Sequence, residues 1–134
     1  MLTSAGTLRY SPALLGGGQE KWWLVMDCDR EIGRYYRSLY EMHWNRCRKI
    51  QPSSWAEHVT IIRNEEPPEA NKKLWLKYDG LSVDFSYSPN TQSDDLYVWL
   101  SVHCPFLLDI REELGLPRDP LYPLHLTVGN SVNL

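Results

Sequence analysis

The chain has 134 residues, a hydrophobic content of 43% and six tryptophans, which fits one folded globular domain with a sizeable core and excludes a disordered chain. Its formal net charge is −3, whereas proteins that hold long nucleic acids through many phosphate contacts carry an excess of basic residues. We therefore expect no long nucleic-acid partner. A small anionic ligand needs only a few local cations and hydrogen-bond donors, and it stays compatible with this charge.

The three cysteines favour an intracellular protein without a metal centre. Cys28, Cys47 and Cys104 form no C-x-x-C pair and no even set for disulfides, so we expect reduced thiols, no zinc site and no other cofactor. No signal peptide is visible, and the apolar run 22–26 is far too short to span a membrane. We therefore expect a cytoplasmic protein with no membrane partner. The oligomeric state is not predicted.

The first third of the chain contains two strand signals. Residues 7–10 alternate between polar and apolar side chains, which predicts a short strand that ends at Ser11-Pro12. The glycines at 16–18 match neither the P-loop nor the dinucleotide fingerprint, and we interpret them as a loop. The continuous apolar run 22–27 predicts a central strand.

A helix follows, with Asp29 as its N-cap and an end near residue 45. Spacings of three and four define the face that we expect to pack on the sheet: Ile32, Tyr35, Tyr36, Leu39 and His43, the last at the edge of the packed face or in solvent. The basic residues 46–49 are interpreted as a solvated helix end.

The second half repeats a strand, a helix and a strand. Residues 64–73 are polar and predict a loop, and Asp79-Gly80 predicts a hairpin turn between strands at 74–78 and 81–87. After a polar loop at 88–95, residues 96–103 predict a strand. A helix then begins at Pro105 and runs to Leu114, where Gly115 and Pro117 are stop signals.

The tripeptide H-x-T occurs twice, as His58-Val59-Thr60 and as His125-Leu126-Thr127. Each copy lies in a short run that predicts a strand, and side chains two apart on a strand share a face. Each histidine therefore points the same way as its threonine, and the two copies can line one cleft. Arg63 has the opposite parity from His58, and we interpret it as a rim residue.

Two histidines and two threonines suit the cleavage of a phosphodiester without a metal. One imidazole can remove the proton of a ribose 2′-hydroxyl, and an imidazolium can protonate the departing 5′-oxygen. The threonine hydroxyls can donate hydrogen bonds to the non-bridging phosphate oxygens, where charge builds up. The alternative is that each H-x-T is an incidental strand sequence. His43 is interpreted as a residue at the edge of the packed helix face or in solvent, and His103 as a buried, hydrogen-bonded residue of its strand.

The two motifs are 125 − 58 = 67 residues apart, which is half of the chain. Each follows a strand and a helix in the same order. We therefore predict a single domain, 1–134, built by internal duplication from lobes at roughly 1–65 and 66–134, with each lobe donating one H-x-T to the shared cleft.

The paired motifs resemble the 2H phosphoesterase superfamily, and the flanking sequence is most similar to the phage anti-CBASS phosphodiesterases, which destroy the cyclic oligonucleotide signals of bacterial immunity. The residues that carry the resemblance are 6–10, 23–29, 35–37, 58–63, 97–100 and 122–130. The resemblance implies an α+β fold with two pseudo-symmetric lobes of antiparallel sheet, helices outside and a central cleft.

The resemblance also implies an activity. His58, Thr60, His125 and Thr127 would be the catalytic set of a metal-independent phosphodiesterase. Its substrates would be cyclic di- and trinucleotides such as 3′,3′-cGAMP, whose 3′,5′ linkages are opened by the 2′-hydroxyl through a cyclic phosphate. A phage protein of this kind would act in the cytoplasm of the host cell. The roles of base and acid stay unassigned between the two histidines.

Exposed aromatic side chains would hold the bases of such a substrate, since stacking contributes about 1–3 kcal/mol per base. Tyr10, Trp75 and Tyr87 lie near expected strand ends or loops and are our candidates, with ordinary core packing as the alternative for each. Three other functions stay open: the same chemistry on RNA ends, 2′,3′-cyclic phosphates or 2′,5′-linked oligonucleotides; non-catalytic binding of cyclic nucleotides; and an interaction module.

Overall fold

The computed structural model describes residues 1–11, 21–53 and 55–133, and it has an α+β fold with an antiparallel sheet, as predicted. Its elements in chain order are β1 (Leu2–Tyr10), β2 (Trp23–Asp27), α1 (Arg30–His43), β3 (Arg48–Gln51), β4 (His58–Arg63), the 3₁₀ helix η1 (Glu69–Leu74), β5 (Ser82–Tyr87), β6 (Gln92–Ser93), β7 (Tyr97–His103), α2 (Pro105–Glu113) and β8 (His125–Asn133). The glycine loop predicted at 16–18 lies outside the described residues.

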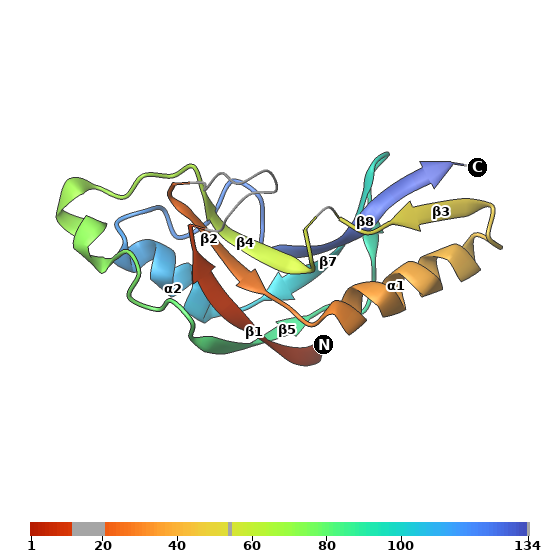
Figure 1. Ribbon diagram of the computed structural model, residues 1–134, viewed down its shortest axis with the longest axis horizontal. Helices are drawn as coiled ribbons and strands as arrows, with labels where there is room; N and C mark the ends of the chain where they lie inside the picture. The colour runs from red at the N-terminus through yellow and green to blue at the C-terminus, as the bar shows by residue number, and fades with distance from the viewer. Residues whose placement is uncertain (12–20, 54, 134) are drawn as a thin grey trace.

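Six of the strands close into an antiparallel barrel. Their order is β8-β4-β2-β1-β5-β7, and β7 pairs back onto β8 to close the ring. The short strands β3 and β6 extend the sheet beyond the ring, on β8 and β7 respectively. Figure 1 shows β4, β7 and β8 crossing the middle of the molecule. The strands that carry the two H-x-T motifs, β4 and β8, are thus neighbours within one continuous ring.

Alternation along the strands separates the barrel interior from its outer face. On β1, Leu8 and Tyr10 are buried whereas Thr7 and Arg9 are exposed, as expected for a strand with one face in a core. The interior is filled in the same way from the other strands, by Leu24, Met26, Val59, Ile61, Ile62, Val83, Phe85, Val98, Leu100, Leu126 and Val128 among others.

Helix α1 begins as predicted. Asp29 is the N-cap, and its Oδ1 accepts a hydrogen bond of 2.9 Å from the backbone N–H of Glu31. Ile32 and Tyr36 are buried, but the prediction is wrong for Tyr35 and Leu39, which are exposed. The helix projects along the molecule beside β8 and β3 (Figure 1), so the sheet covers only a narrow stripe of it. His43 is exposed, in agreement with the prediction.

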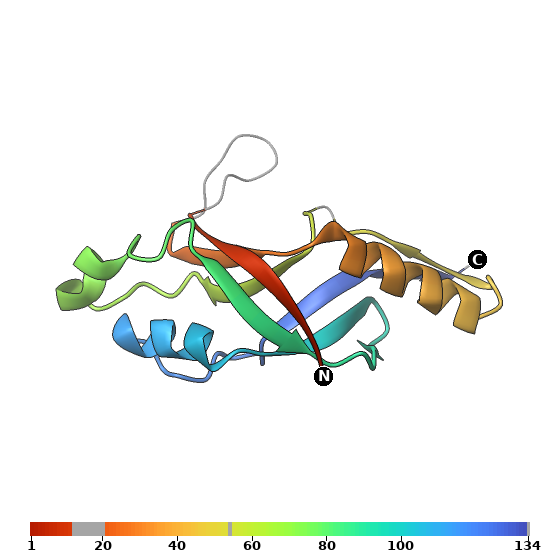
Figure 2. The ribbon, with the colours of Figure 1, turned by 90° about the horizontal axis from the view of Figure 1, so that it is seen from below.

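Helix α2 also agrees with the sequence signals. Pro105 occupies its first turn, Leu114 is the C-cap, and Gly115 has a φ of 77°, the left-handed conformation that ends many helices. Figure 2 shows α1 and α2 toward opposite ends of the long axis of the molecule, as Figure 1 does.

Three local predictions were wrong. One is the loop at 64–73, part of which forms η1. The basic stretch 46–49 is not a helix end, because residues from Arg48 onward form β3 and pair with β8. Residues 74–78 are not a strand, because η1 ends there and turns follow. The turn at Asp79-Gly80 exists, with φ of 81° at Gly80, but β5 pairs with β1 instead of forming a hairpin with 74–78. In the described parts of the chain, no helix has the length and apolar character needed to cross a membrane.

Candidate functional site

The structure brings the two H-x-T motifs together on adjacent strands. Val59 and Leu126 are register partners across β4 and β8, and both are fully buried in the barrel. In an antiparallel pair this register sets His58 beside Thr127 and Thr60 beside His125, with roughly 5 Å between opposed Cβ atoms. All four side chains are half-buried on the outer side of the sheet. We call this surface, defined by His58, Thr60, His125 and Thr127, the motif face.

A β-bulge follows each motif at the same position. Opposite β2, Thr60 pairs with Val25 and Ile62 pairs with Leu24, so Ile61 is the extra residue. Opposite β7, Thr127 pairs with Trp99 and Gly129 pairs with Val98, so Val128 is the extra residue. Ile61 and Val128 each lie three residues after the motif histidine. A bulge increases the local twist of a strand and changes the direction of the side chains that follow it.

The bulge at Ile61 corrects the prediction for Arg63. Strict alternation assigns Arg63 to the face opposite His58, but Ile61 and Ile62 are both buried, so the parity shifts by one residue. Arg63 therefore lies on the same side of the sheet as Thr60. Its guanidinium carbon is 4.6 Å from the ring centroid of Trp23, its register partner on β2, within the range of a cation–π contact.

Both motif histidines hold the same tautomer. The Nδ1 of His58 lies 2.9 Å from the backbone oxygen of Ala56, and the Nδ1 of His125 lies 2.8 Å from that of Pro123. A carbonyl oxygen only accepts hydrogen bonds, so Nδ1 carries the proton in each ring. This leaves Nε2 of each imidazole as the atom that can accept or donate a proton.

Asp27 and Arg9 are charged groups that act on the pKa of His58. Asp27 is the register partner of His58, and the Arg9 guanidinium donates to both of its carboxylate oxygens, at 2.8 and 3.0 Å. Burial lowers the pKa of His58, and it outweighs the Ala56 carbonyl and the Asp27 carboxylate, which act to raise it. His58 is therefore neutral at pH 7, as a general base must be.

Two aromatic side chains that the sequence analysis did not select lie beside the motif histidines. The Trp55 ring is 5.1 Å from the ring of His58 and stacks on Trp23 with centroids 4.5 Å apart. Trp99 is the register partner of Thr127, and its ring is 6.4 Å from that of His125. Two features of the sequence could have indicated them. Trp55 lies three residues before His58. Trp99 and Ser101 are two apart on one strand and therefore share a face, and they are the register partners of Thr127 and His125.

The aromatic residues that were selected lie elsewhere. Tyr10 and Tyr87 are only 6% and 8% exposed because both point into the barrel, so the prediction that they offer a ring face to a base is wrong. Trp75 is half-buried, packs edge-on against Tyr10 at 5.0 Å, and donates from Nε1 to the Ser11 hydroxyl. These contacts support the end of the barrel.

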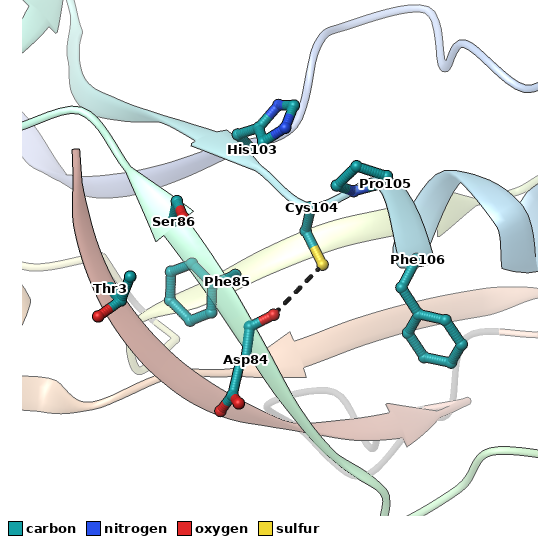
Figure 3. Close-up of a pocket in the computed structure, with 8 residues that line it drawn as sticks. All are labelled: Thr3, Asp84, Phe85, Ser86, His103, Cys104, Pro105 and Phe106. Carbon is teal, nitrogen blue, oxygen red and sulfur yellow. Dashed lines mark hydrogen bonds between the residues drawn. The ribbon is translucent and has the colours of Figure 1, made fainter.

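Two hollows occur away from the motif face. The one in Figure 3, of about 250 Å³, lies where β7 meets α2, and it includes His103 and Cys104, whose thiol donates to the backbone oxygen of Asp84. The prediction that His103 is buried is wrong, because this last residue of β7 is exposed. The other lies between α1 and the end of β5 and is lined by Tyr35, Tyr36 and Tyr87 among others. Neither of these two hollows is lined by a motif residue.

The cysteines are all free thiols, of which Cys47 is exposed and Cys104 is buried. Burial raises the pKa of Cys28 to about 12, so this thiol is not a nucleophile at neutral pH. Across residues 1–11, 21–53 and 55–133, no three His, Cys, Asp or Glu side chains gather as the ligands of a metal ion would.

Comparisons with models of protein families, with curated proteins and with solved structures gave no match. The geometry of the motif face is therefore the basis for a functional proposal.

Proposed function

We propose that this protein is a phosphodiesterase of the 2H type that cleaves the 3′,5′ linkages of cyclic di- and trinucleotides. The observation that carries the proposal is the register of β4 and β8 at Val59 and Leu126. This register sets each motif histidine beside the threonine of the other motif, on one side of the sheet. Two imidazoles with their Nδ1 atoms fixed and two hydroxyls are thereby available to one phosphate group bound on the motif face.

His58 is the general base in this proposal and His125 the general acid. Nε2 of neutral His58 takes the proton of the ribose 2′-hydroxyl, and the 2′-oxygen bonds to phosphorus. The bond from phosphorus to the 5′-oxygen breaks, and that oxygen takes a proton from Nε2 of protonated His125. Water opens the resulting 2′,3′-cyclic phosphate with the two roles reversed, so that each histidine returns to its starting state.

The threonines stabilise the charge that develops on phosphate. The hydroxyls of Thr60 and Thr127 donate hydrogen bonds to the non-bridging oxygens, which carry more negative charge in the transition state than in the substrate. Both threonines are β-branched residues on paired strands, so their rotamers are restricted before substrate arrives. Neither role requires a metal ion.

Local repetition supports the assignment to the 2H superfamily. In both halves a strand leads into a helix, and the motif strand follows, directly in the second half and after β3 in the first. The motif strand pairs antiparallel with the first strand in each half. In both, the histidine Nδ1 bonds to the carbonyl two residues earlier, and a bulge follows the threonine. We propose that the domain arose by duplication of this unit, with lobes at roughly 1–65 and 66–134.

The surroundings of the motifs support the proposed substrate class. Trp55 and Trp99 lie beside the two histidines and provide rings on which bases can stack without selecting one base. The acidic net charge disfavours long RNA but not a small cyclic dinucleotide. We propose the immune signals of bacteria as substrates, which makes this a phage protein that evades CBASS immunity in the cytoplasm of its host.

The test uses wild-type protein, His58→Ala, His125→Ala and the control His43→Ala, each incubated with 3′,3′-cGAMP in excess EDTA and followed by chromatography. We expect cleavage by the wild type and by His43→Ala, whose side chain is exposed on α1, and none by the other two. Recovery of the intact ring from all four proteins contradicts the choice of substrate. The same proteins are then given 2′,3′-cyclic phosphates and 2′,5′-linked oligonucleotides, and the absence of any cleavage contradicts the chemistry.

A further inference from the structure

Two arginines on the helices bind the backbone at the two bulges. Arg37 of α1 donates from Nη1 to the oxygen of Val128, and Arg111 of α2 donates from Nη1 to the oxygen of Ile61, both at 2.9 Å. Val128 and Ile61 are the extra residues of the bulges that follow Thr127 and Thr60. We propose that Arg37 and Arg111 are positioning residues, which hold the two H-x-T motifs in the geometry that catalysis needs; this inference rests on the proposed function.

The need for these arginines arises from the bulges themselves. An extra residue in a strand is left out of the ladder of backbone hydrogen bonds. Both bulge residues are buried, and a buried carbonyl without a partner is costly, so each oxygen needs a donor from outside the sheet. A guanidinium reaches such a site with several donors in a fixed plane.

Arg111 is 1% exposed, which makes it the most buried charged side chain in the described residues. Besides the oxygen of Ile61, it binds both carboxylate oxygens of Glu65, at 2.7 and 2.8 Å, and its Nε donates to the oxygen of Pro117 at 2.9 Å. The bidentate pair lowers the pKa of Glu65. Because four acceptors compensate one guanidinium, the Arg111 side chain has a single well-defined position.

Arg37 forms the corresponding contacts in the first half. Its Nη1 also donates to Oε1 of Glu57 at 2.7 Å, and Glu57 is buried directly before His58 in the sequence. Glu57 fits against α1 only because residue 33 is glycine: a Cβ on Gly33 would lie 2.0 Å from the same Oε1. The helix, the carboxylate and the bulge of β8 are therefore packed as one unit.

Each arginine links one motif to the chain that leads into the other. Arg37 holds the bulge after Thr127 and the residue before His58, and Arg111 holds the bulge after Thr60 and residue 117 in the segment that enters β8. The two contacts are crossed, because each helix binds the motif strand of the other half. A displacement of either bulge turns the preceding threonine and histidine, and misplacement by about 1 Å reduces rates by about a hundredfold.

The test replaces each arginine by methionine, which keeps most of the side-chain length and removes the donors. We expect Arg37→Met and Arg111→Met to lower kcat for 3′,3′-cGAMP at least tenfold, with KM changed by less than threefold. In the ligand-free proteins, the imidazole signals of His58 and His125 in ¹H–¹³C spectra should shift, whereas those of His43 and His103 stay in place. Arg37→Lys, which can still donate to Val128 and Glu57, should recover part of kcat.

The matched controls are Arg34→Met and Arg118→Met, which remove exposed arginines that form surface ion pairs near the same helices; both should leave kcat and the imidazole signals unchanged. Folded arginine variants with a lower Tm but unaltered kcat and His58 and His125 signals would overturn the inference. If Arg111→Met does not fold, the Arg37 variants decide alone. The spectra distinguish the two failures, because they report on the positions of the histidines even if the protein cleaves none of the substrates.

Discussion

Asp27 and His58 are register partners on β2 and β4, and the Asp27 carboxylate is held by two hydrogen bonds from Arg9. The carboxylate acts to raise the pKa of His58, and the guanidinium acts to lower it. Together with burial, which has the largest effect, these groups determine the pH at which His58 becomes a base. The acid side of the pH profile should therefore report on Asp27.

We expect Asp27→Asn to move the acid limb of kcat/KM to lower pH, because the carboxylate that acts to raise the pKa of His58 is lost. In the proposed mechanism His58 acts as a base when neutral, so activity should be lost as the pH falls through its pKa. Loss of the carboxylate lowers this pKa further, so the active form persists to lower pH. The measurement is kcat/KM between pH 4.5 and 9, with Asp95→Asn, an exposed residue outside the motif face, as control. An acid limb that moves upward would contradict the role of Asp27.

Thr60→Val and Thr127→Val should each lower kcat by about 10²- to 10³-fold, the usual cost of removing one donor to a developing oxyanion. Valine keeps the branched shape and suits a strand, so the Tm should change by little. The control is Thr3→Val on β1, which replaces an exposed threonine on another strand and should keep full activity. Equal rates for all three variants would mean that the motif hydroxyls do not contact phosphate.

The sequence predicted the H-x-T strands because polar and apolar residues alternate along them. The apolar residues pack in the core, and this packing fixes which face each side chain takes. The prediction failed one residue later, since a bulge needs the pairing of two strands and leaves no local signal at Ile61. Strict parity therefore assigned Arg63 to the wrong face. The same limit applies to Arg37 and Arg111, whose acceptors at Val128 and Ile61 are 91 and 50 residues away in sequence.

Turn chemistry was predictable, but strand partners were not. Asp79-Gly80 does form a turn, and the Asp79 side chain accepts a hydrogen bond from the backbone N–H of Tyr10. The turn leads β5 onto β1, because β1 begins at Leu2 and is longer than the sequence pattern suggested. Tyr10 and Tyr87 were placed wrongly for a related reason, because both share the parity of core residues once these strands are paired.

Trp55→Ala should raise KM for 3′,3′-cGAMP by roughly 5- to 150-fold, since one stacked base contributes about 1–3 kcal/mol. The half-buried Trp55 ring lies beside His58, and Trp23 stacks on one of its faces. We expect the other face to stack on a base without a change in the position of the ring. Trp44→Ala is the control, because Trp44 lies at the C-cap of α1. Initial rates over a range of substrate concentrations give both constants, and an unchanged KM would assign Trp55 to packing alone.

Gly33→Ala should lower the free energy of unfolding by about 1–2 kcal/mol. Alanine inside a helix is normally more stable than glycine by about 1 kcal/mol, but the added Cβ would lie 2.0 Å from Glu57 Oε1 and 2.5 Å from its Cδ. Overpacking of this kind costs about 1–3 kcal/mol, and the displaced carboxylate also loses its 2.7 Å contact with Arg37. Urea unfolding measures the change, with Ser38→Ala on the exposed side of the same helix as the control that should gain stability. If Gly33→Ala is also more stable than the wild type, Glu57 is not packed against α1 as described, and the link from Arg37 to the residue before His58 is lost with it.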